Sequence, residues 1–188
     1  MRVLVAGILG GIAMFIWASV AHMATPLASI GLQAPPGGEA TVAALHERFG
    51  DKQGQYFFPY MPGHDSKAMA AQMEKLKTSP SGLIVYNPPG SGGIAPRRLA
   101  IELGLEVIEA ILMAAILAAA TTGFGVRWGL AVLIGVIAAI ATNFSYWNWY
   151  GFNLDYTLAN AFTELVKFVV AGLVAAVVLG WRRRRRRG

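Results

Sequence analysis

The sequence contains no cysteine and has few charged residues. None of its 188 residues is Cys, and Asp, Glu, Lys and Arg together make up only 14% of the chain. The absence of cysteine excludes disulfide bonds and thiolate chemistry. Any folded part outside a membrane must therefore be stable without covalent links. Hydrophobic residues make up 55% of the chain.

The hydrophobic residues gather into four long runs, which predict membrane-spanning helices. The runs cover residues 3–24, 99–120, 128–144 and 158–181. A helix needs about 20 mostly apolar residues to cross about 30 Å of hydrocarbon, and each run comes close to that length. Continuous Ala, Leu, Val and Ile without alternation does not suit a transmembrane barrel. The predicted fold is an all-α transmembrane four-helix bundle with a small extracytoplasmic α/β insertion.

The first run also has a second interpretation. Its basic start and the small residues Ser19 and Ala21 fit a signal peptide that is cleaved. However, the run is longer than the roughly 7 to 15 apolar residues of such a peptide. Gly7 and Gly11 also form a small-xxx-small pair suited to helix packing. We therefore predict a first transmembrane helix over residues 1–24, with the signal peptide as the alternative.

The positive charge lies at the C-terminal end of the chain. The formal net charge of +6 equals the six consecutive arginines of the tail, of which Arg182 is the first and Arg187 the last. Basic residues in short loops stay in the cytoplasm, and Arg127 in the second connection would share that side with the tail. With four spans, both termini are then cytoplasmic in a bacterial plasma (inner) membrane. The tail, residues 182–188, is expected to lie against anionic lipid headgroups.

Residues 25–98 are expected to form a small extracytoplasmic domain with flanking linkers, and residues 99–181 to hold the second to fourth transmembrane helices. Segments 55–60 and 82–87 are typical of strands. With a helix between them, they allow a right-handed crossover unit if the strands are parallel. Two amphipathic helices are expected to turn apolar faces towards a core. These apolar positions are Val42, Leu45, Phe49, Met69, Met73 and Leu76.

Polar residues form stripes within the second and fourth runs. The spacing i, i+4, i+7 places Glu102, Glu106 and Glu109 on one helix face. An ionised side chain at the bilayer centre is unfavourable by about 2.5 to 3.5 kcal/mol, so such stripes are expected to face each other. Glu109 and Lys167 are predicted at the same depth. The predicted intramembrane polar seam comprises Glu102, Glu106, Glu109, Asn160, Glu164, Lys167 and His22.

The seam has two interpretations. One is a satisfied polar core that fixes the register of the helices. The other is a proton or cation site open to the outside, because ionisable residues inside membranes often mark ion pathways.

A second candidate site is an aromatic hairpin between the third and fourth runs. Its residues are Tyr146, Trp147, Trp149, Tyr150 and Phe152. Aromatic belts lie at membrane interfaces because their rings are amphipathic. The alternative is a stacking platform or a docking point for a partner.

The SYWNWYGF motif, together with YFFPYMPG and SPSGLIVYNP, resembles a family of small bacterial four-helix integral membrane proteins with a short outer domain and no assigned activity. The resemblance implies the four-helix layout and no reaction.

No motif predicts a catalytic residue, a cofactor or a metal. The GSGG segment lacks the lysine and hydroxyl of a phosphate loop, and His46 and His64 form no HExxH pattern. The arginine tail lacks the interleaved aromatics of a nucleic-acid binder, so nucleic acid is not an expected partner. We predict a non-enzymatic accessory or scaffold subunit that binds a membrane protein partner or forms a homo-oligomer. The alternative is a small proton- or cation-coupled transporter or channel component that uses the seam.

Overall fold

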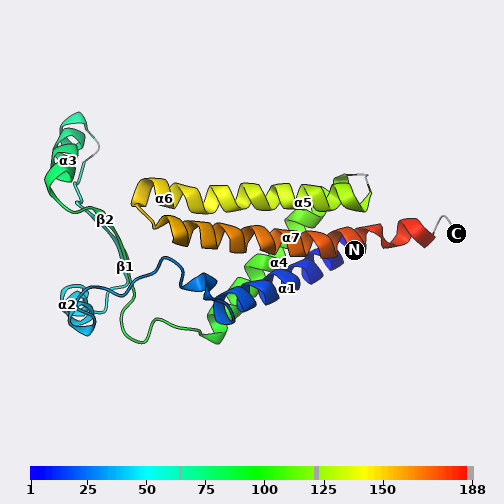
Figure 1. Cartoon of the computed structure of the whole chain (residues 1–188), viewed down its shortest axis with the longest axis horizontal. Helices are drawn as coiled ribbons and strands as arrows, with labels where there is room; N and C mark the ends of the chain where they lie inside the picture. The colour runs from blue at the N-terminus through cyan, green and yellow to red at the C-terminus, as the bar shows by residue number, and fades with distance from the viewer. Residues whose placement is uncertain (64, 121–122, 186–188) are drawn as a thin grey trace. The chain divides into compact units, whose positions relative to one another are not determined.

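The computed structural model describes residues 1–63, 65–120 and 123–185, and the chain divides into two compact units. The helical unit comprises Met1–Leu32 and Ile94–Gly188, and the second unit comprises Gln33–Gly93. Figure 1 shows both units along the chain.

The helical unit is built from four long helices. They are α1 (Arg2–Met23), α4 (Pro96–Ala119), α5 (Phe124–Ala139) and α7 (Leu154–Arg185). Helix α1 packs against both α4 and α7, and α5 packs against α7. Figure 1 shows α5 and α7 side by side, while α4 is inclined to them. The contact of α4 with α7 is therefore confined to a crossing region.

Three helices in the described residues are long and apolar enough to cross a membrane. They cover Arg2–Met23, Phe124–Tyr150 and Leu154–Gly180, and they indicate a membrane protein. Helix α4 has 24 residues, but every stretch of spanning length within it contains three glutamates, including Glu106. The four-helix transmembrane layout therefore stays a prediction.

Small residues let the helices approach closely. A Cβ added at Gly7 would collide with Ile111, and one added at Gly11 would collide with the backbone of Val107. The predicted small-xxx-small pair is thus the face of α1 that contacts α4. The core around it is rich in alanine, while large apolar side chains such as Leu133 point outwards, as suits hydrocarbon.

Arg127 lies in the first turn of α5 instead of in the predicted loop, and it is buried. Its Nε donates to the Leu117 carbonyl at 3.0 Å, and its Nη2 donates to the Ala120 carbonyl at 3.2 Å. These carbonyls belong to the end of α4, where no further helical N–H is available to them. The Arg127 guanidinium therefore caps the C-terminus of α4.

The aromatic segment is helical for most of its length. Beyond α5, the π-helical segment η2 (Ile140–Phe144) and helix α6 (Ser145–Tyr150) carry the chain onwards. The turn to α7 starts at Gly151, which is left-handed with φ +69°. Asn153 then caps α7, because its Oδ1 accepts hydrogen bonds from the next helix's first amides. The predicted hairpin is thus a short turn between two helices.

The second unit contains the two predicted strands, but their direction excludes a crossover. It consists of α2 (Glu39–Phe49), β1 (Gly54–Phe58), α3 (Ser66–Thr78) and β2 (Gly82–Tyr86). The strands pair antiparallel, with Gly54 opposite Tyr86. Parallel strands need a crossover connection, whereas antiparallel strands form a hairpin. Helix α3 therefore lies in the connection of a hairpin.

The expectation of a core in this unit holds only in part on α2, where Phe49 makes aromatic contacts but Val42 is 55% exposed. Phe49 stacks on Tyr56 with ring centroids 4.3 Å apart, and its centroid lies 5.1 Å from that of Tyr86. On α3, by contrast, the apolar face is exposed, and Met73 is 62% exposed. None of the described residues between Gln33 and Gly93 is buried. The prediction that the α3 face is buried is wrong.

The arginine tail lies largely outside the described part of the chain. Helix α7 continues to Arg185, but residues 186–188 and all side chains from residue 181 onwards are outside it.

Candidate functional site

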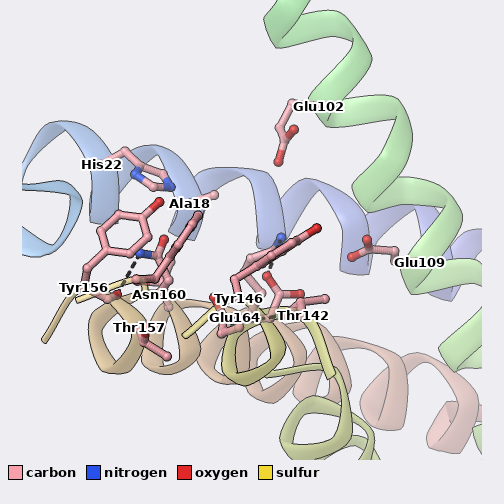
Figure 2. Close-up of a pocket in the computed structure, with 14 residues that line it drawn as sticks. Ala18, His22, Glu102, Glu109, Thr142, Tyr146, Tyr156, Thr157, Asn160 and Glu164 are labelled. Atoms are coloured by element: carbon pink, nitrogen blue, oxygen red, sulfur yellow. Dashed lines mark hydrogen bonds and ion pairs between the residues drawn. The ribbon is translucent and has the colours of Figure 1, made fainter. Parts of the chain in front are cut away.

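A pocket of about 390 Å³ lies in the helical unit (Figure 2). It is lined by 14 residues from α1, α4, α7 and the segment from η2 to the start of α7. Helices that come together in this way often form small-molecule sites in membrane proteins and in helix bundles. Its ionisable lining residues, tyrosines aside, are His22, Glu102, Glu109, Glu164 and Lys167.

The structure brings the predicted polar seam to this pocket. Six of the seven seam residues line it: the five ionisable residues just named and Asn160. The seventh, Glu106, is 1% exposed and contacts Lys167. Helical spacing aligns each stripe along its own helix, and the packing of α1 with α4 and α7 brings the stripes together.

Lys167 is held between two carboxylates. Its Nζ lies 3.1 Å from Glu106 Oε1 and 3.2 Å from Glu164 Oε2. Glu164 accepts a hydrogen bond from Lys167, whereas the contact with Glu106 has the distance of an ion pair without hydrogen-bond geometry. The α4 partner of Lys167 is thus Glu106, one turn before Glu109. The prediction that Glu109 and Lys167 lie at the same depth assumes parallel helices, but α4 is inclined to α7 (Figure 1).

Several carboxylate oxygens lack a hydrogen-bond donor among the described residues. They are both oxygens of Glu106 and Oε2 of Glu109, and all three are buried. A buried acceptor without a donor is unfavourable by about 1 to 3 kcal/mol, and by more when it is charged. Of these two residues Glu109 lines the pocket, so its Oε2 could accept a hydrogen bond from a ligand there.

The pocket has a surplus of acidic groups. Within the described residues, neither Glu102 nor Glu109 forms an ion pair, whereas Glu106 and Glu164 share Lys167. Figure 2 shows the side chains of Glu102 and Glu109 extending from α4 towards the space between the helices. A negatively charged cavity with low-dielectric walls attracts cations.

Aromatic rings form another wall of the same pocket. Tyr146, Phe152 and Tyr156 line it, with centroids 5.5 Å apart for the first pair and 5.8 Å for the second. Of the predicted aromatic group, Tyr146 and Phe152 therefore meet the seam. Trp147, Trp149 and Tyr150 do not line the pocket, and Trp149 is 77% exposed. The latter position suits an interfacial belt.

Two tryptophans and the π-helical segment were not predicted as parts of the site. Trp17 Nε1 donates to the Thr163 carbonyl at 3.0 Å, and Trp128 Nε1 donates to the Val169 carbonyl at 3.2 Å. These bonds attach α1 and α5 to α7 on both sides of Lys167. An indole within an apolar run needs a hydrogen-bond acceptor for its N–H, so the sequence does carry a signal for these two bonds. We recognise no sequence signal for the π-helical turn that contributes Asn143 to the pocket.

The described residues contain no group of three or more His, Asp or Glu arranged to hold a metal ion. His46 is instead hydrogen-bonded to the Tyr86 hydroxyl at 2.9 Å in the second unit. His64 lies outside the described residues.

The chain matches no protein-family model, no curated protein and no solved structure.

Proposed function

We propose that the protein is a multi-pass membrane protein that acts as a small proton- or cation-coupled transporter or channel component. In this proposal its pocket is the cation site. The observation that carries this proposal is the pair Glu102 and Glu109, two carboxylates that line the pocket and form no ion pair within the described residues. Ionisable groups within membrane helices are costly unless paired, and they commonly line ion pathways. A cation would supply the missing charge.

In this proposal the seam has two parts with different roles. The cluster of Lys167, Glu106 and Glu164 joins α7 to α4 and keeps the pocket in shape. Glu102 and Glu109 receive the cation, and His22 lies on the α1 side of its path. The proposal includes four membrane spans, cytoplasmic termini, an extracytoplasmic second unit and a bacterial plasma membrane. The arginine tail rests on anionic headgroups.

The test is ion flux through the full chain reconstituted in liposomes. Proton and monovalent-cation flux should be measurable for the wild type and should be lost in Glu109→Gln. The matched control is Glu47→Gln, which removes one charge from the exposed face of α2. Absence of flux in the wild type, or equal flux in Glu109→Gln and the wild type, would contradict the proposal.

The second candidate is the accessory or scaffold role, favoured by the exposed side chains of α3. Met69, Met73 and Leu76 are exposed on one face of this helix. A membrane protein partner or a second copy would cover them. Mild solubilisation followed by mass spectrometry should then recover a stoichiometric partner or an oligomer. A protein that purifies alone as a monomer would argue against this role.

A further inference from the structure

We infer that the pocket binds an organic ammonium ion, the protonated primary amine of a soluble alkyl diamine or of an aminolipid headgroup. This inference rests on the proposed cation site and adds the chemical class of its ligand. It is carried by the size of the pocket, by the spacing of two glutamates and by the aromatic wall.

The size of the pocket exceeds what a bare ion needs. Its volume of about 390 Å³ lies within the roughly 300 to 1,000 Å³ of ordinary small-molecule sites. Divalent metal ions require several oxygen ligands at short distances in a compact shell. The described residues provide no group of three His, Asp or Glu placed to form one. The cavity therefore suits a molecule with an organic body.

The spacing of the two unpaired glutamates suits an elongated cation. Glu102 and Glu109 are seven residues apart on α4, which is about two turns, or roughly 10 Å along the axis. Both extend towards the pocket (Figure 2), and Glu109 Oε2 is buried without a donor. A primary ammonium offers three N–H donors. A short diamine can therefore place one ammonium near each carboxylate.

The aromatic wall suits the remainder of such a ligand. The rings of Tyr146, Phe152 and Tyr156 form a continuous edge of the pocket, with neighbouring centroids less than 6 Å apart. Cations bind over ring faces, and alkyl chains pack on them. A carboxylate wall together with an aromatic wall recognises an organic cation.

Lys167 does not cancel the attraction for a second cation. Its ammonium lies between Glu106 and Glu164, and the residue is 8% exposed. Two carboxylates thus face a single ammonium in that cluster. With both carboxylates ionised, Lys167 offsets only one of the two negative charges in that cluster, and the charges of Glu102 and Glu109 are additional.

The first experiment titrates the full chain, held in nanodiscs of phosphatidylcholine, with putrescine in a calorimeter. We expect saturable binding that weakens about tenfold or more in Glu102→Gln/Glu109→Gln, since two charge-assisted contacts are lost. The matched control is Glu39→Gln/Glu47→Gln, which removes two exposed charges from α2 and should leave the affinity unchanged. Phe152→Leu changes no charge and should weaken putrescine binding several-fold, so the aromatic wall is tested even if the acidic variant does not fold.

The second experiment distinguishes an aminolipid from a free amine. Native mass spectrometry compares retention of phosphatidylethanolamine and phosphatidylcholine by the wild type and by Glu102→Gln/Glu109→Gln. Selective retention of phosphatidylethanolamine that is lost in the variant identifies the headgroup as the source of the ammonium. Binding of putrescine alone identifies a soluble amine.

Two outcomes overturn the ligand class. One is the failure of both putrescine and phosphatidylethanolamine to bind the folded wild type. The other is displacement of putrescine by Na⁺, K⁺ or Mg²⁺ at lower concentration than putrescine itself requires. If Glu109-dependent ion flux persists in either case, the proposed cation function stands and only the organic ligand is wrong. If that flux is also absent, both proposals fail.

Discussion

Lys167 Nζ lies 3.1 Å from Glu106 Oε1, and this ion pair joins α7 to α4 in the interior of the helical unit. The side chain of Glu106 is 1% exposed and that of Lys167 is 10% exposed. Removing one partner of such a pair leaves the other charge buried alone, whereas removing both can be nearly neutral. The pair therefore allows a clear test of how the helices are held together.

Lys167→Met should lower the free energy of unfolding by about 3 to 5 kcal/mol, because Glu106 and Glu164 lose their shared cation. The double variant Lys167→Met/Glu106→Gln should recover part of that loss. Denaturant unfolding in detergent, followed by tryptophan fluorescence, measures both. Additive losses in the double variant would show that the two side chains are not coupled.

Gly11→Ala should destabilise the contact of α1 with α4. An added Cβ would lie 2.5 Å from the Val107 Cα, so the backbones must separate, which costs about 1 to 3 kcal/mol. The matched control is Gly104→Ala on α4, where nothing lies within 4 Å and the better helix propensity of alanine should be neutral or stabilising. Thermal unfolding of both variants compares them. Equal shifts in Tm would contradict the close packing of these two helices.

Arg127→Met should fray the end of α4. The carbonyls of Leu117 and Ala120 lose their donors, at a cost of about 1 to 3 kcal/mol. Arg127→Lys should not restore both hydrogen bonds, because a lysine ammonium cannot reproduce the planar arrangement of donors in a guanidinium. Hydrogen exchange of the last turn of α4 reports the change. Unchanged protection in Arg127→Met would exclude this capping role.

Exposure on α3 can be measured by thiol labelling, because the chain has no cysteine of its own. Met73→Cys should react rapidly with a maleimide, since Met73 is 62% exposed. Met113→Cys, at a site on α4 that is 1% exposed, should react only after unfolding. Slow labelling of Met73→Cys in purified protein would show that its face is covered.

The polar stripes could be predicted from sequence because helical periodicity alone places Glu102, Glu106 and Glu109 on one face. The partner of Lys167 could not be predicted, because it depends on the inclination of α4 to α7, which no local pattern encodes. The two strands were predicted from composition, but their direction depends on long-range pairing. The exposure of Met73 was also beyond prediction. Periodicity shows that a face is apolar but does not show what covers it.

The pocket, too, could be predicted only in part from the sequence. Spacing placed Lys167 and Glu164 on one stripe, and topology placed the aromatic group near the start of the same helix. That Tyr146 lies on the pocket follows from the helical continuation into α6, where the sequence predicts a hairpin. The meeting of acidic and aromatic walls was therefore visible only in three dimensions.

The most direct test of the cation site is esterification of carboxyl groups by a diazo ester, which primary amines do not consume, carried out on the full chain in nanodiscs and quantified by mass spectrometry at each glutamate. We expect Glu109 and Glu102 to be modified in the absence of added cation and putrescine to protect both, while modification of the exposed Glu47 is unchanged. Labelling of Glu109 and Glu102 that neither putrescine nor an alkali cation alters at constant pH would contradict a cation site in this pocket.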